Sequence, residues 1–237
     1  MARRVARLTL DTLATLPDSV RGCLAWELDA VRRAQVERAG AAVEEKEAWL
    51  SRVLLEWGSC GRVVYVDDEP AGFVLYAPPA YFPGTASYPT APLGEDAVQL
   101  ATAQVFEGYD GVGLGRLLMQ EMVKDLLTRG DFRSVEAIGL HGSPTTGDCL
   151  LPAPFLQRVG FKTQRAHLRY PRMRMEMKSV LTWREEMEAA LARLLGVVRP
   201  RRAAAAQRLG RLSRLDGRRP PPGAPSGRVS PPPAAGP

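Results

Sequence analysis

Residues 97–122 read AVQLATAQVFEGYDGVGLGRLLMQEM. The segment opens with a mostly apolar run, 97–106, which is typical of a strand buried on both faces of a sheet. Four glycines then fall within the eight positions 108–115. A helical pattern follows, with apolar residues three or four positions apart at Leu114, Leu117, Leu118, Met122, Leu126 and Leu127. The segment therefore predicts a buried strand, a tight glycine turn and a helix of about four turns.

The predicted start of this helix is a candidate anion site. The first backbone N–H groups of a helix have no partner within the helix, and this end of the helix dipole is positive. Gly111, Gly113 and Gly115 would let a diphosphate approach these amides, and Leu114 would anchor the helix on the core. A plain glycine-rich turn between a strand and a helix is the alternative.

Two common nucleotide-binding motifs do not fit the glycine stretch. Gly111 and Gly113 match the first two glycines of the dinucleotide fingerprint, but Arg116 stands at the third, and no acidic residue ends a second strand about 20 residues on. The phosphate-binding loop of nucleoside triphosphatases needs Gly-Lys followed by Ser or Thr, which is absent here.

The rest of the body predicts a mixed α and β fold. Helical spacing marks the segments DSVRGCLAWEL (18–28), VEEKEAWLSRVLLEWG (43–58) and APFLQRVGF (153–161), the last ending at Gly160. Residues 62–78 predict a strand–turn–strand hairpin. Further strands are predicted at ARLTL (6–10), SVEAIGL (134–140), KTQRAHLRY (162–170) and RMRMEM (172–177).

Composition indicates a chain with a sizeable core and no membrane span. The 237 residues are 45% apolar, and no apolar run approaches the roughly 18–20 residues that a membrane helix needs. The N-terminal apolar run is too short for a signal peptide. The three cysteines are scattered and odd in number, which predicts a chain without disulfides in a reducing compartment, so we expect a cytoplasmic protein. His141 and His167 lack metal-ligand spacing, and no metal site is expected.

The chain divides into a predicted domain, 1–180, an amphipathic helix, 181–198, and a tail, 199–237. The tail holds nine arginines and one acid, which gives it a net charge of +8. The whole chain has a net charge of +6, so residues 1–198 have a net charge of −2. From Gly217 onward it is nearly all Pro, Gly, Arg, Ser and Ala, a composition typical of disorder. The helix could dock on the domain or form a homodimer.

Three pieces of the sequence together resemble the GCN5-related N-acetyltransferase family. They are RVVYVDDEPAGFVLYAP (62–78), LATAQVFEGYDGVGLGRLLMQEMV (100–123) and FLQRVGF (155–161). The family's loop motif, Gln/Arg-x-x-Gly-x-Gly/Ala, corresponds to residues 110–115, and its Tyr-x-x-x-Gly-Phe corresponds to 156–161. The resemblance implies a central, mostly antiparallel, splayed mixed sheet flanked by helices.

The resemblance also implies a site for acetyl-CoA. Backbone amides of the loop would bind the cofactor diphosphate, and the end of the strand before it would hold the pantetheine arm. The cofactor-binding residues implied are Gln104, Val105, Gly111, Val112, Gly113, Leu114, Gly115 and Arg116. The sequence departs from the family at Asp110, where the motif opens with Gln or Arg, at Leu156, where a tyrosine often protonates the thiolate, and near Gln99, where histone-acetylating relatives carry a glutamate base.

Acetyl transfer needs a base for the amine and a proton for the departing thiolate. Glu107, at the end of the predicted strand 97–106, is the first candidate base, and Glu136 is the second. Cys149 lies where the family has groups near the thiolate and is the candidate proton donor. The alternatives are that Glu107 is a solvated loop acid, that Glu136 makes a cross-strand polar contact, and that Cys149 is a small buried cysteine. Tyr109 could contact the cofactor, and the aromatic segment 75–89 could line the acceptor site or cover a sheet edge.

These observations predict an acetyl-CoA-dependent N-acetyltransferase, with a small-molecule or peptide amine as acceptor. The alternative is a binding module that has lost catalysis and acts through its basic tail on nucleic acid or another acidic partner. The tail lacks interleaved aromatic residues and a known DNA-binding fold, which disfavours nucleic acid.

Overall fold

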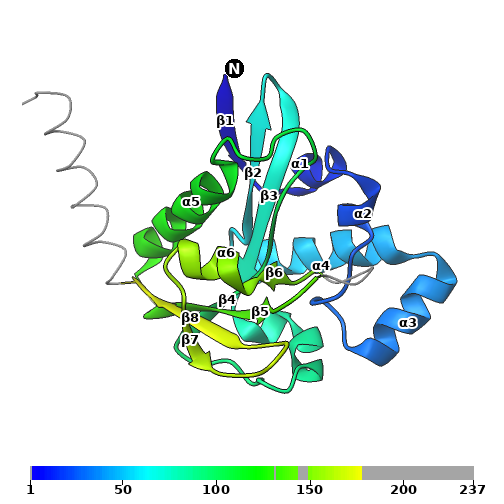
Figure 1. Cartoon of the computed structure of the whole chain (residues 1–237). Helices are drawn as coiled ribbons and strands as arrows, with labels where there is room; N and C mark the ends of the chain where they lie inside the picture. The colour runs from blue at the N-terminus through cyan, green and yellow to red at the C-terminus, as the bar shows by residue number, and fades with distance from the viewer. Residues whose placement is uncertain (1, 131, 144–148, 178–237) are drawn as a thin grey trace, which may run out of the picture. The chain divides into compact units, whose positions relative to one another are not determined.

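The computed structural model describes residues 2–130, 132–143 and 149–177 (Figure 1). The predicted helix 181–198 and the tail 199–237 lie outside these residues. In chain order the elements are β1 (Arg3–Arg7), α1 (Leu10–Ala14), α2 (Asp18–Arg21), α3 (Ala30–Ala39), α4 (Ala42–Glu56), β2 (Gly61–Val66), β3 (Glu69–Ala77), the 3-10 turns η1 (Pro79–Tyr81) and η2 (Pro83–Ser87), β4 (Ala97–Val105), α5 (Leu114–Arg129), β5 (Ser134–Leu140), β6 (Leu151–Pro152), α6 (Ala153–Arg158), β7 (Lys162–Arg165) and β8 (Arg172–Glu176).

The strands form one mixed sheet in the order β1-β2-β3-β4-β5-β8-β7, with β6 paired to β5. Neighbouring strands are antiparallel except for the pairs β4–β5 and β5–β6. The predicted hairpin is confirmed as β2 and β3, and its turn places Asp67 and Asp68 at φ 49° and 68°, a conformation that aspartate tolerates better than most residues. The sheet therefore agrees with the expected mixed, mostly antiparallel architecture.

The two central strands separate partway along their length. β4 and β5 pair only from Ala97 to Gln99, opposite Ser134 to Glu136. Beyond this point β4 and β5 do not pair, and the last two residues of β5, Gly139 and Leu140, pair with β6 instead. We call the opening between the diverging strands the fork. A β-bulge lies just past it, because Leu75 of β3 faces Thr102 whereas Tyr76 faces Leu100, which leaves Ala101 as an extra residue in β4.

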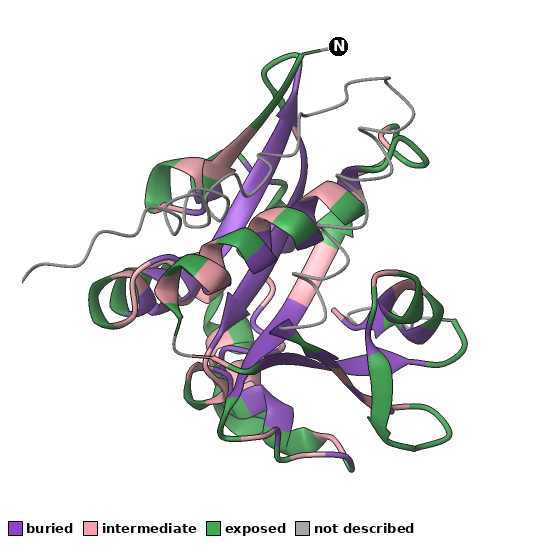
Figure 2. Cartoon of the chain, turned by 90° about the vertical axis from the view of Figure 1, so that its left-hand side faces the viewer, coloured by how far each residue is buried: buried purple, intermediate pink, exposed green. Residues whose placement is uncertain are grey.

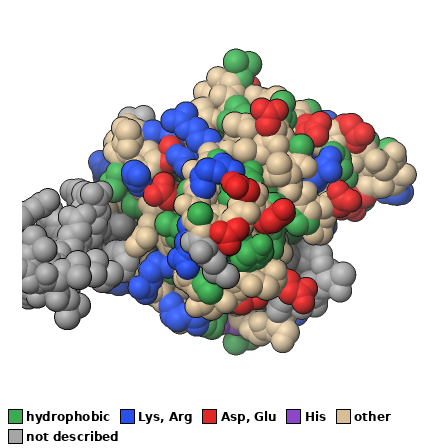
Figure 3. All heavy atoms as spheres, turned by 90° about the horizontal axis from the view of Figure 1, so that it is seen from above, with side chains coloured by type: hydrophobic (Ala, Val, Ile, Leu, Met, Phe, Trp, Pro, Cys, Tyr) green, Lys and Arg blue, Asp and Glu red, His purple; other side chains and the backbone are tan. Residues whose placement is uncertain are grey.

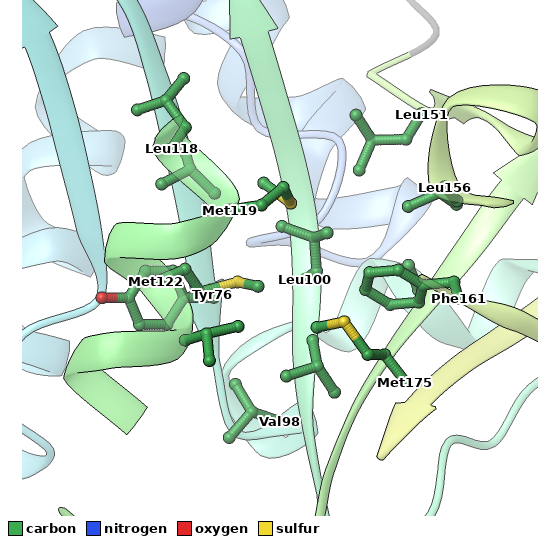
Figure 4. Close-up of a cluster of buried hydrophobic side chains, with 14 of the residues drawn as sticks. Tyr76, Val98, Leu100, Leu118, Met119, Met122, Leu151, Leu156, Phe161 and Met175 are labelled. Atoms are coloured by element: carbon green, nitrogen blue, oxygen red, sulfur yellow. The ribbon is translucent and has the colours of Figure 1, made fainter. Parts of the chain in front are cut away.

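Each face of the sheet carries its own hydrophobic cluster. The first cluster joins the sheet to α5 and α6, and Figure 4 shows Leu118, Met119 and Met122 of α5 beside Leu100 of β4. The second joins the opposite face to α1 and α4 through Leu13, Trp49 and Val53, among others. Figure 2 shows buried residues concentrated on the strands and on the inner sides of the helices. Both faces of β4 are therefore covered near the fork, as its apolar sequence predicts.

Several predicted boundaries are wrong. The strand predicted at 6–10 ends at Arg7, because Thr9 caps α1 through a capping box with Thr12. The helix predicted at 18–28 ends at Arg21, and the strand predicted at 162–170 ends at Arg165. Helix α3 is not predicted from the sequence, because none of its residues is buried and it therefore has no apolar stripe.

Candidate active site

The start of α5 is an uncapped helix N-terminus. Gly113 is the N-cap residue and supplies no side-chain hydrogen bond to the first turn. Gly111 and Gly113 have φ of 74° and 85°, a left-handed conformation that L side chains rarely adopt. A Cβ added to either glycine would meet no atom within 4 Å, so the space in front of the loop is open. The positive end of the α5 dipole therefore faces open space.

A cleft of about 620 Å³ begins at this loop. It is lined by Ala103, Gln104, Val105, Tyr109, Asp110, Gly111, Gly113, Leu114, Gly115, Arg116, Leu118, Leu151, Pro152, Phe155, Arg158 and Val159. The end of β4, the glycine loop, the first turn of α5 and the β6–α6 segment thus meet around one opening. Seven of the eight predicted cofactor-binding residues line it. Val112 does not, and its side chain is exposed.

Gly115 has a different role from the two glycines before it. A Cβ at this position would lie 3.2 Å from Cε2 of Phe155, which belongs to α6. The absence of a side chain therefore lets α5 and α6 approach each other closely. Gly115 and Phe155 both line the cleft, so the expected role of Gly115 in leaving room for a ligand stays a prediction beside this packing role.

The charges of the cleft are two arginines and one acid. Arg116 lies in the first turn of α5, Arg158 ends α6, and Asp110 precedes the glycines. Arg158, Phe155 and Leu151 are cleft residues that were not among the predicted site residues, although the segment FLQRVGF contains two of them. Together with the helix dipole, this charge balance makes the cleft suited to a negatively charged ligand.

The candidate bases differ in their surroundings. Glu107 is exposed in the turn after β4 and is not among the residues that line the cleft. Glu136 is 1% exposed, accepts a hydrogen bond from the Gly94 N–H at 2.9 Å and pairs with Arg174 Nη1 at 3.1 Å. Glu136 is thus held in a structural ion pair. This agrees with the cross-strand polar contact that the sequence analysis gave as the alternative to a catalytic role.

Cys149 is not a free thiol. Its sulfur is bonded to that of Cys23, so the expectation of a chain without disulfides is wrong, and with it the cysteine argument for a reducing compartment. A disulfide sulfur carries no proton, so Cys149 cannot be the proton donor in this state. Burial raises the pKa of the remaining free thiol, Cys60, to about 12, which keeps it protonated and unreactive at neutral pH.

Two residues at family positions are buried. Leu156 is fully buried, and Figure 4 shows it within the first hydrophobic cluster. Gln99 is also fully buried, and its Oε1 accepts a hydrogen bond from Thr85 Oγ1 at 2.8 Å. Tyr109 supplies the only hydroxyl group among the described residues that line the cleft. The geometry therefore supports ligand binding more directly than it identifies an acid or a base.

Other kinds of site find no support in the described residues. No group of three or more His, Cys, Asp and Glu side chains there could hold a metal ion. None of the helices in this part of the chain is long and apolar enough to cross a bilayer. On the face shown in Figure 3, basic side chains gather mainly on the left and acidic ones on the right, so neither sign covers the whole face.

The fold is similar to that of solved acetyltransferases. PaiA N-acetyltransferase from Thermoplasma acidophilum, solved with coenzyme A, matches 74% of this chain over 99% of its own, at 15% identity and a TM-score of 0.50. An N-acetyltransferase from Staphylococcus aureus Mu50 matches 75% of this chain over 99% of its own, at 11% identity and the same TM-score. No family model and no curated protein matches the sequence. The chain therefore has the fold of these N-acetyltransferases, as the resemblance in its sequence implies.

Proposed function

We propose that this protein is an acetyl-CoA-dependent N-acetyltransferase. The observation that carries the proposal is the uncapped N-terminus of α5, whose amides open into the cleft without an intervening side chain. Such a terminus suits a diphosphate, and the fork beside it gives an extended arm a strand edge to lie along. The similarity of fold to N-acetyltransferases adds support, but at 15% identity or less it concerns the fold alone.

Different residues of the cleft would bind different parts of acetyl-CoA. The N–H groups of Gly113 to Gly115 hold the diphosphate, and the backbone of Gln104 and Val105 pairs with the pantetheine arm. Leu118 and Leu151 exclude water from the floor of the cleft. When bound, acetyl-CoA supplies an acyl thioester that an amine can attack.

The proposal assigns proton transfer from the amine to Glu107. Glu107 lies two residues past the end of β4, the strand whose edge beyond Gln99 is not paired with β5. The role of proton donor to the thiolate passes from Cys149 to solvent or to Tyr109. The alternative function through the basic tail concerns residues 199–237, which lie outside the described part of the chain.

The test compares two glycines at opposite ends of α5. Gly113 and Gly130 have similar left-handed φ, 85° and 77°, and neither would place a Cβ against a neighbour. Replacing either with alanine strains the backbone to a similar extent, by about 1 kcal/mol. Only Gly113→Ala adds a methyl group to the cleft, and we expect it to weaken CoA binding by at least about tenfold.

Isothermal titration calorimetry with CoA on wild type, Gly113→Ala and Gly130→Ala measures this difference. Wild-type binding retained in Gly130→Ala and lost in Gly113→Ala would support the proposed cofactor site. Equal affinity of the two variants, or no CoA binding by the wild type, would show that the glycine loop does not hold the cofactor.

A further inference from the structure

Arg158 is an exposed arginine in the wall of the cleft, at the last position of α6. Its guanidinium group makes no hydrogen bond or ion pair within the described part of the chain. By contrast, Arg62 and Arg129 both pair with Asp125. The N–H donors and the positive charge of Arg158 are therefore available to a ligand in the cleft.

The contact between α5 and α6 fixes the place of Arg158 along the cleft. Helix α6 begins at Ala153, directly after β6, which pairs with the end of β5 beside the fork. Phe155 then lies beside Gly115 in the first turn of α5. Arg158 follows on the same face of α6, about 4.5 Å farther along the helix axis. Counted from the fork along α6, Arg158 therefore comes after the N-terminus of α5.

The parts of CoA follow one another in the same order. In the proposed function the pantetheine arm lies along β4 and the diphosphate lies at the first turn of α5. The part of CoA beyond the diphosphate is an adenosine that carries a phosphate on its 3′ oxygen. Such a phosphate carries about −1.5 to −2 charges at neutral pH, and its oxygens suit the planar guanidinium group of an arginine. Arg158 lies where this phosphate would follow the diphosphate.

The residues around Arg158 do not compete with a phosphate for its guanidinium group. The segment 149–165, which includes β6 and α6, contains Arg158, Lys162 and Arg165 and no acid. Asp110 is the only acid among the described residues that line the cleft, and no ion pair joins it to Arg158. A phosphate would therefore meet the positive charge of Arg158 without displacing a carboxylate from it.

A cation at the end of a helix also has a purely structural explanation. The C-terminal end of the helix dipole is negative, so an arginine there is stabilising without any ligand. Arg38 offers a matched case, because it is also exposed, lies in the last turn of α3 and does not line the cleft. Glutamine at either position removes one positive charge from a helix end and keeps a residue that favours helix. A difference in ligand binding between the two variants therefore arises in the cleft.

We propose that Arg158 binds the 3′-phosphate of CoA and makes the protein select CoA over 3′-dephospho-CoA. This assignment rests on the proposed function. The two ligands share the pantetheine arm, the diphosphate and the adenosine, so the other contacts of the cleft are the same for both. The preference between them therefore measures recognition of the 3′-phosphate alone.

Isothermal titration calorimetry with CoA and with 3′-dephospho-CoA tests the assignment on the full chain. The proteins compared are the wild type, Arg158→Gln and Arg38→Gln. We expect the wild type and Arg38→Gln to bind CoA at least about tenfold more tightly than 3′-dephospho-CoA, because a charge-assisted contact to phosphate is lost with the phosphate. In Arg158→Gln the affinity for CoA should fall to that for 3′-dephospho-CoA, which should itself be unchanged. Such a cycle isolates the contact between one side chain and one group of the ligand.

Three results would overturn the assignment. Equal affinity of the wild type for the two ligands would show that the 3′-phosphate is not recognised. An equal loss of affinity for both ligands in Arg158→Gln would mean that the guanidinium group contacts another part of the coenzyme or supports the fold. A loss of preference in Arg38→Gln as large as in Arg158→Gln would indicate a general effect of net charge.

Failure of this inference differs from failure of the proposed function. If the wild type binds CoA and 3′-dephospho-CoA equally well, the cofactor site stands and only the role of Arg158 is wrong. If the wild type binds neither ligand, the proposed function fails and the role of Arg158 fails with it.

Discussion

Glu107 is the residue on which the chemistry of the proposed reaction depends most. Glu107→Gln keeps the size of the side chain and removes its ability to accept a proton. We expect kcat/KM to fall by about a hundredfold, the lower end of what a positioned general base contributes. CoA affinity should not change, because Glu107 does not line the cleft.

Steady-state kinetics of the wild type and Glu107→Gln at one fixed pH provides the check, with CoA affinity measured on both. Unchanged kcat/KM in the variant would show that bound water, rather than this carboxylate, accepts the proton.

The residues of the site could be predicted only in part. The glycine loop was predictable because left-handed backbone and a bare helix start leave a sequence signature. The roles of Gly115 and Cys149 were not, since they depend on Phe155 and Cys23, which are distant in sequence and meet these residues only in the fold. A cysteine count cannot reveal which pairs come together.

At the scale of elements, α5 is anchored to the sheet by a buried charge cluster near its C-terminal end. Asp125 bonds Arg62 Nη2 at 2.6 Å, Arg129 Nη2 at 3.0 Å and the Tyr76 hydroxyl at 2.9 Å. Burial raises the pKa of Tyr76, so the phenol stays protonated and donates to Asp125. Together these contacts join α5 to β2 and β3.

Loss of the Asp125 carboxylate should therefore destabilise the fold. We expect Asp125→Ala to lower the free energy of unfolding by about 3 kcal/mol, because the largely buried Arg62 guanidinium loses its counter-charge. The control is Glu121→Gln on the same helix, where a partly exposed contact to Lys124 at 3.6 Å should contribute less than about 0.5 kcal/mol. Urea unfolding measures both variants, and equal stabilities would contradict the anchoring role.

The sequence predicted best the elements in which the spacing of apolar residues matches the residues that are buried. β4, β5 and α5 have long apolar patterns, and their observed bounds fall close to the predicted ones. By contrast, β6 has only two residues, and β7 is exposed along its length. β6 was not predicted, because two residues carry no periodic pattern. A strand was predicted at 162–170, but its end at Arg165 leaves no signal in an exposed segment.

At the scale of the whole molecule, the disulfide closes a large loop. Cys23 follows α2 and Cys149 precedes β6, 126 positions later in the sequence. A cross-link of this span restricts the unfolded chain, and a contribution of about 3 kcal/mol to stability is typical. We expect a reducing agent to lower the melting temperature of the wild type and to have no effect on a Cys23→Ser/Cys149→Ser double variant.

Thiol titration accompanies the melting experiment. The folded, oxidised chain should show almost no reactive thiol, because Cys60 is buried and its pKa is raised. Two thiols should become reactive after mild reduction. Two reactive thiols before any reduction, or identical melting of wild type with and without reductant, would contradict the cross-link.

The divergence of β4 from β5 has one more consequence. Past Gln99 the paired ladder between them ends, which leaves a stretch of main chain inside the sheet ready to accept another extended segment. Without a ligand, this edge is open to insertion of a strand from a neighbouring molecule, which is a common route to aggregation of sheet proteins. A ligand that lies along the edge would block this insertion. Added CoA should therefore reduce aggregation of the protein during purification and storage.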